Sequence, residues 1–137
     1  MPISLHWEAR GVVRTAVGDI AADELFNSVA DLQNDPRFDA LRYVVEDLSA
    51  VASVALDESG LDMLIASAIG AALSNPHIRI AVVLRSPQLI QMAREFAAQS
   101  PYITRTFSTL EAARDWIAQG DVAPVPLDLV LQADVRT

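Results

Sequence analysis

The chain has 137 residues, with 18 acidic side chains against 10 basic ones, a formal net charge of −8. This acidity argues against nucleic acid and anionic membranes as partners, because both attract positive surfaces; peripheral contact with a membrane stays open. The chain contains no Cys, which excludes disulfides and thiolate sites, and its length fits one domain.

The first half of the chain predicts a hairpin, a helix and a buried strand. Alternating apolar side chains at residues 3–7 indicate a strand, and residues 12–17 form a second one that ends at Gly18-Asp19. An apolar stripe predicts a helix over residues 21–33, ended by Asp35-Pro36. Residues 41–48 are rich in β-branched and aromatic side chains, so they predict a strand near the middle of the sheet.

The second half alternates helices with strands. After a predicted loop at residues 49–56, a helix begins with Asp57 or Ser59 as its N-cap and ends at Asn75-Pro76. Its apolar positions form one continuous predicted face: Leu61, Leu64, Ile65, Ala68, Ile69, Ala72 and Leu73. Further elements are predicted in order: a strand at 78–84, a helix from Ser86-Pro87 to Gln99, a strand at 102–107, and a helix from the capping-box sequence at 108–111 to Gly120.

This order predicts an α/β fold with a mixed, mostly parallel five-stranded sheet and about four helices, in one domain over residues 1–120. Residues 121–137 form a C-terminal extension in which leucines alternate with polar residues. Such a segment either makes an extra strand, which can pair with a second copy of the chain and give a homodimer, or packs loosely as a tail.

Sites for catalysis and for cofactors lack a signature in the sequence. His6 falls on a predicted edge strand and His77 in a turn, without the paired carboxylate spacing that metal or acid–base sites use. Glycine-rich nucleotide-binding loops are absent as well. We therefore expect no enzyme, no cofactor and no metal, and the lack of a secretory leader pattern indicates a cytoplasmic protein.

Ser59 falls at the predicted start of a helix, where unpaired N–H groups and the helix dipole stabilise a phosphate. Asp47, Asp57, Glu58 and Asp62 already make this region negative, and a phosphoserine adds about −1.5 to −2 more charge, which would expel a partner. The simpler alternative is that Asp57 or Ser59 only caps the helix, a contribution of about 1 kcal/mol.

Two stretches resemble the STAS family of anti-sigma-factor antagonists. Residues 47–51, Asp-Leu-Ser-Ala-Val, are similar to the family's strand end D-L-S-x-V, and residues 57–61, Asp-Glu-Ser-Gly-Leu, are similar to its helix start D-S-S-G-L. Glu58 replaces a residue that is usually Ser or Thr in the family, and the loop between the two stretches is longer. Residues 79–83 and 106–117 look more like the SpoIIAA-like offshoot of this family.

The resemblance implies a non-enzymatic regulatory module in signalling that binds a protein partner, with Ser59 as the phosphate acceptor. The implied partner-binding residues are Asp47, Ser49, Asp57, Glu58, Ser59 and Gly60. The SpoIIAA-like group also distantly resembles lipid-binding proteins, so the alternative is a carrier of a hydrophobic or lipid-like molecule in a SEC14-like pocket. The apolar residues at 51–56 and 66–73 would suit such a ligand, and core packing explains them as well.

Overall fold

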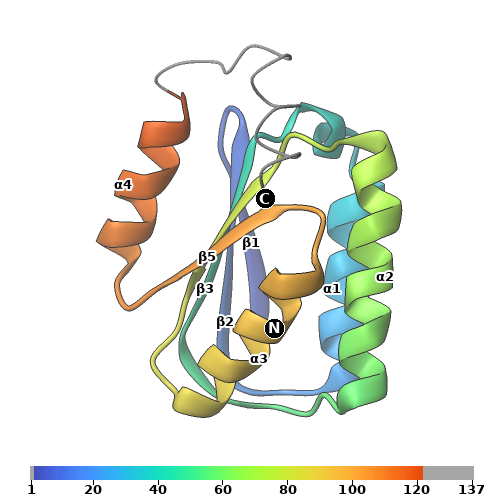
Figure 1. Cartoon of the computed structure of the whole chain (residues 1–137), viewed down its shortest axis with the longest axis vertical. Helices are drawn as coiled ribbons and strands as arrows, with labels where there is room; N and C mark the ends of the chain where they lie inside the picture. Colours follow the sequence, from blue (N-terminus) through green and yellow to red (C-terminus); the bar gives the residue numbers. More distant parts are fainter. Residues whose placement is uncertain (1, 122–137) are drawn as a thin grey trace.

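The structure, a computed structural model, describes residues 2–121 and is built on one five-stranded sheet in the order β1-β2-β3-β4-β5 (Figure 1). β1 pairs antiparallel with β2, and the other pairs are parallel. The strands are β1 (Ile3–Trp7), β2 (Gly11–Ile20), β3 (Tyr43–Val54), β4 (Arg79–Val83) and β5 (Ile103–Phe107). The predicted mixed, mostly parallel sheet with its third strand at the centre is confirmed.

Helices cover both faces of this sheet (Figure 1). α1 (Ala22–Asn34), α2 (Glu58–Ser74) and α3 (Pro87–Gln99) lie on one face, which we call the three-helix face, and α4 (Leu110–Asp121) lies on the other. A short 3-10 helix, η1 (Pro36–Ala40), follows α1. The four predicted α-helices are therefore all present in the described part of the chain.

Alternation along β2 and β3 sends neighbouring side chains to opposite faces. Val12 and Val44 pack under α1 and α2, whereas Val13 and Val45 pack against Trp116 of α4. Arg14 and Glu46 follow Val12 and Val44 by two residues and are paired in register, so both point to the three-helix face. This face therefore holds two charged side chains among apolar ones.

The predicted loop at residues 49–56 is wrong, because β3 continues to Val54. β2 is also longer than predicted, and the two strands stay paired until Ile20 lies beside Val54. The register shifts on both sides of Gly18, whose φ of 75° is a conformation that glycine adopts without strain. Backbone pairing thus extends a segment of small residues that has little strand preference of its own.

The predicted apolar face of α2 is correct for its inner half and wrong for two residues. Leu61, Ile65 and Ala68 are buried, whereas Ile69 is 51% exposed and Leu73 is 87% exposed. α2 is apolar around most of its circumference, so the spacing of its apolar residues does not show which side faces the sheet.

The N-cap of α4 and the segment that follows this helix were both subjects of sequence predictions. Within the predicted capping-box sequence at 108–111, Thr109 caps α4, because its hydroxyl accepts the Ala112 N–H at 3.1 Å. The extension predicted as a strand or dimer arm lies outside the described residues from position 122 onward. The homodimer therefore stays a prediction.

Asn75 is a buried polar link between the end of α2, η1 and Tyr102, the residue before β5. Its side-chain amide donates to the carbonyl oxygens of Phe38 and Leu41 at 2.8 and 2.9 Å, and its side-chain oxygen accepts the His77 N–H at 3.1 Å. The Tyr102 hydroxyl donates to the Asn75 backbone oxygen at 2.9 Å. One side chain thus satisfies backbone groups that burial would otherwise leave unpaired.

Replacing Asn75 with Ala should lower the free energy of unfolding by about 2 to 4 kcal/mol, because buried backbone groups lose their partners. Urea denaturation measures this loss. The matched control Ser74→Ala, one residue earlier and exposed, should change stability by less than about 0.5 kcal/mol. A loss below about 1 kcal/mol for Asn75→Ala would contradict the assigned role.

α4 is joined to the β1–β2 hairpin by a charged cluster. Arg114 donates two hydrogen bonds to the Glu8 carboxylate, at 2.6 and 2.7 Å, and the Tyr43 hydroxyl donates to the same carboxylate. The Arg114 hydrogen bonds, with a smaller contribution from Tyr43, lower the pKa of Glu8 from 4.5 to about 2. Burial and then the Glu8 hydrogen bond raise the pKa of Tyr43 to about 12.

This cluster should make stability depend on pH in the acid range. A carboxyl whose pKa is lowered by folding stabilises the fold above its unfolded pKa, so the contribution of Glu8 should be complete above about pH 4.5 and lost toward pH 2. Urea midpoints of the wild type and of Glu8→Gln should therefore differ at neutral pH and converge near pH 2. A constant difference across that range would contradict the assignment.

Candidate functional site

The start of α2 holds the predicted site residues. Asp57 is the N-cap, since its carboxylate accepts the Gly60 N–H at 2.7 Å, and its backbone oxygen accepts the Leu61 N–H at 2.9 Å. Ser59 lies in the first turn of the helix with an exposed side chain. Of the two predicted caps, Asp57 has the role, and the Ser59 hydroxyl stays accessible to chemistry.

Gly60 is buried and allows close packing at this helix start. A Cβ at this position would lie 2.6 Å from Cδ1 of Leu56, closer than carbon atoms approach without a shift. Glycine therefore lets Leu56 pack against the first turn of α2. Gly60 thus allows Leu56 to pack directly below the turn that carries the exposed Ser59.

An open groove lies beside Ser59, between the starts of α1 and α2 and the end of β3. Phe26 of α1 and Met63 of α2 supply large apolar side chains to it, and Ser59 borders it. The complete lining is Ala22, Phe26, Val54, Ala55, Leu56, Asp57, Ser59, Gly60 and Met63. Three of the predicted site residues, Asp57, Ser59 and Gly60, are therefore brought together at one surface feature.

Asp47 and Ser49 lie apart from this groove. Asp47 follows Val45 by two residues, so it points to the α4 face, and its carboxylate accepts from the Ser49 hydroxyl at 2.7 Å and from the Ser49 N–H at 3.2 Å. This pair sits where β3 changes register against β2. Glu58 is exposed at the helix start but is not part of the groove lining.

The outward side of α2 carries exposed apolar residues that sequence reasoning missed. Met63, Ile69 and Leu73, which we call the outer face of α2, are exposed and continue from Ser59 along the helix. Ile69 and Leu73 were predicted to be buried, and Met63 and Phe26 were not singled out. A signal was present, because a helix with apolar residues on all sides must place some of them outward.

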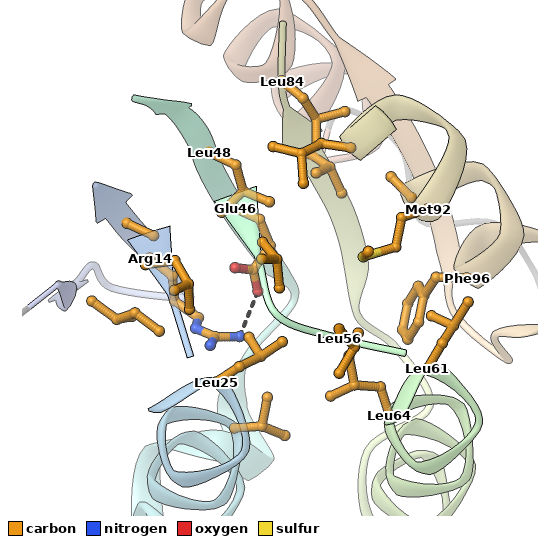
Figure 2. Close-up of a pocket in the computed structure, with 18 of the residues that line it drawn as sticks. Arg14, Leu25, Glu46, Leu48, Leu56, Leu61, Leu64, Leu84, Met92 and Phe96 are labelled. Carbon is orange, nitrogen blue, oxygen red and sulfur yellow. Dashed lines mark hydrogen bonds and ion pairs between the residues drawn. The ribbon is translucent and has the colours of Figure 1, made fainter. Parts of the chain in front are cut away.

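A second feature is a partly open cavity of about 170 Å³ under the three helices (Figure 2). Aliphatic side chains, mainly Leu, Ile and Val, line most of it, together with Met92 and Phe96 of α3. Arg14 and Glu46 are the charged residues in the lining, joined by an ion pair of 2.8 Å. This pair was not predicted, although Arg14 and Glu46 carry opposite charges and both lie within predicted strands.

Within residues 2–121, no group of three or more His, Cys, Asp and Glu residues could hold a metal ion. Nor does any helix there have the length and apolar character needed to cross a membrane.

Comparison with known proteins finds similarity in fold. No family model and no curated protein matches the chain. An anti-sigma factor antagonist from Mycobacterium paratuberculosis matches with a TM-score of 0.61 and 19% identity over 85% of this chain and 92% of its own. The unphosphorylated anti-sigma factor antagonist SpoIIAA matches with a TM-score of 0.59 and 13% identity over 86% and 98%.

A third structure, an uncharacterised protein from Shewanella loihica with a SpoIIAA-like fold, matches with a TM-score of 0.54 and 13% identity over 84% of this chain and 91% of its own. At these identities the similarity concerns the fold. The chain has the SpoIIAA-like, STAS-type fold that the sequence resemblance implied.

The capping role of Asp57 can be separated from the effect of its charge. Asp57→Ala should destabilise the protein by about 1 kcal/mol, because the Gly60 N–H loses its acceptor. Asp57→Asn keeps an acceptor and should stay within a few tenths of a kcal/mol of the wild type. Urea denaturation checks both variants, with the exposed Asp62→Ala as control; equal losses for Ala and Asn would rule out the cap as the cause.

Proposed function

We propose that the protein is a non-enzymatic regulatory module of the anti-sigma-factor-antagonist type, which binds a protein partner through the start and the outer face of α2. Phosphorylation of Ser59 would switch this binding. The observation that carries the proposal is the position of Ser59: exposed in the first turn of α2, beside the groove and in line with exposed apolar residues. The fold shared with anti-sigma factor antagonists supports it.

The outer face of α2 supplies the affinity in this proposal. Met63, Ile69 and Leu73 are exposed along one side of the helix, and each apolar side chain that a partner buries contributes about 1.5 to 3 kcal/mol. Rows of apolar residues at helical spacing are one way in which proteins recognise one another. A partner that covers this row also covers Ser59.

The charge at the helix start supplies the switch. Added phosphate is stabilised within the protein by the free N–H groups and the dipole of the helix start, although Asp57 already takes the Gly60 N–H. The same phosphate stands next to Glu58 and Asp62, both exposed carboxylates, and next to apolar residues that a partner must bury. Desolvating about two more negative charges at that place opposes binding, so phosphorylation releases the partner.

The partner in this proposal is a regulatory protein of the anti-sigma-factor class. One of the solved structures with this fold is SpoIIAA of Bacillus in its phosphorylated form, with a TM-score of 0.56. A cytoplasmic location and a homodimer remain predictions, and neither is needed for binding through α2.

The carrier alternative is favoured by one observation, the apolar cavity on the three-helix face. The cavity and the outer face of α2 involve different residues, so carrying a ligand and binding a partner are compatible. The size of the cavity restricts which ligand fits.

Recovery of the partner from the native host tests the proposed function. Ser59→Ala should retain the partner, whereas Ser59→Asp and Ile69→Glu should each weaken its binding about tenfold or more. Ile103→Glu is the matched control, because Ile103 on β5 is 65% exposed and undergoes the same change on another surface. Each variant is first checked for folding by circular dichroism.

Isothermal titration with the purified partner then gives the affinities. Equal affinity for wild type, Ser59→Asp and Ile69→Glu would place the interface elsewhere. A loss with Ile103→Glu alone would move it to the β5 edge.

A further inference from the structure

The partly open cavity on the three-helix face is bordered by the sheet and by all three helices. Leu25 comes from α1, Leu61 and Leu64 come from α2, and Phe96 comes from α3 (Figure 2). Apart from the charged pair, the residues that line it are hydrophobic. A protein interior is normally packed closely, so a space of about 170 Å³ in this position stands out from ordinary packing gaps.

One end of the cavity is polar and incompletely satisfied. Arg14 is 5% exposed; one terminal nitrogen donates to Glu46 at 2.8 Å and the other to the Ser28 hydroxyl at 2.9 Å. The Nε atom of Arg14 is buried and has no hydrogen-bond partner. A buried donor without an acceptor is unfavourable, and an oxygen in the cavity would satisfy it once a shift of the Arg14 side chain opens Nε to that space.

We propose that this cavity binds a small neutral molecule, about the size of a substituted benzene ring, whose apolar body fills the apolar space and whose single oxygen accepts a hydrogen bond from Nε of Arg14 after a shift of that side chain opens this atom to the cavity. The proposal goes beyond the partner interaction and does not depend on it, since it needs neither Ser59 nor the outer face of α2.

The volume of the cavity favours a compact molecule over a lipid. An engineered apolar cavity of about 150 Å³ takes up benzene, so a space of about 170 Å³ holds about six to eight non-hydrogen atoms. Typical pockets for larger ligands begin at about 300 Å³. A long acyl chain exceeds this space and would extend through its open side, so the cavity favours a compact ligand for the carrier alternative.

The ion pair between Arg14 and Glu46 favours a neutral ligand. The positive charge of Arg14 is already balanced by Glu46 at 2.8 Å, and a carboxylate placed beside them would be repelled by Glu46. Nε remains a donor, so it favours a hydroxyl or carbonyl oxygen. Water alone would find few polar partners in the rest of the lining, whereas a ring fills the apolar part.

Titration with phenol and with toluene is the direct test, because the two molecules have nearly the same shape and differ by a hydroxyl in place of a methyl. Backbone amide chemical shifts of the full chain report where each binds. We expect phenol to bind about tenfold more tightly than toluene and to shift amides around the cavity. Equal affinities, or tighter binding of toluene, would overturn the polar half of the proposal.

Two variants locate the ligand. Ala93→Leu, on the cavity wall, should reduce phenol binding at least tenfold, while Ala98→Leu, exposed on the same helix, should leave it unchanged. The double variant Arg14→Met with Glu46→Leu replaces the ion pair by apolar groups of similar volume, which folds tolerate. It should remove the preference for phenol over toluene.

Two results reject the site itself. If millimolar phenol shifts no amide resonances of the wild type or of Ala93→Leu, phenol does not enter the cavity. The space would then be filled by water or closed. Binding of oleate with shifts at the same amides would overturn the size assignment. Thermal denaturation of every variant confirms that it is folded before titration.

Discussion

The parallel pairing of β2 with β3 is the constraint on which the functional surfaces depend. The two strands run side by side from Gly11 and Tyr43 to Ile20 and Val54, and the Ala55 N–H donates to the Ile20 carbonyl at 2.9 Å just beyond. Both strands therefore deliver the chain to the same edge of the sheet. α1 and α2 both begin there, which creates the groove beside Ser59, and both helices also border the cavity.

Much of this architecture follows from local patterns in the sequence. Alternation at residues 3–7, the apolar run at 78–84 and the stop at Asp35-Pro36 each correspond to an element boundary close to the observed one. The end of β3 could not be found in this way. Residues 49–54 are Ser, Ala and Val, of which Val alone favours strands, and pairing with β2 extends β3 through them.

In the candidate site, too, some features follow from local sequence and others depend on how distant segments pack. Helix-start chemistry in neighbouring residues limits the cap to Asp57 or Ser59, and the structure assigns it to Asp57 and leaves Ser59 exposed. The exposure of Ile69 and Leu73 does not, because it depends on how far α2 is rotated against the sheet. The Arg14–Glu46 pair also depends on register, since the two residues are 32 positions apart and meet only when β2 and β3 align as they do.

Val54 and Leu56 belong to both surfaces, because each lines the cavity and also lines the groove. They form a shared partition, and a substitution in it changes two compartments at once. Experiments at Leu56 therefore confound the two proposed activities, whereas Ala93 lies on the cavity side alone and Phe26 and Met63 on the groove side alone. A side chain at position 54 or 56 must therefore suit both the cavity and the groove. Changes meant for one compartment alone are best made at residues that line only that compartment.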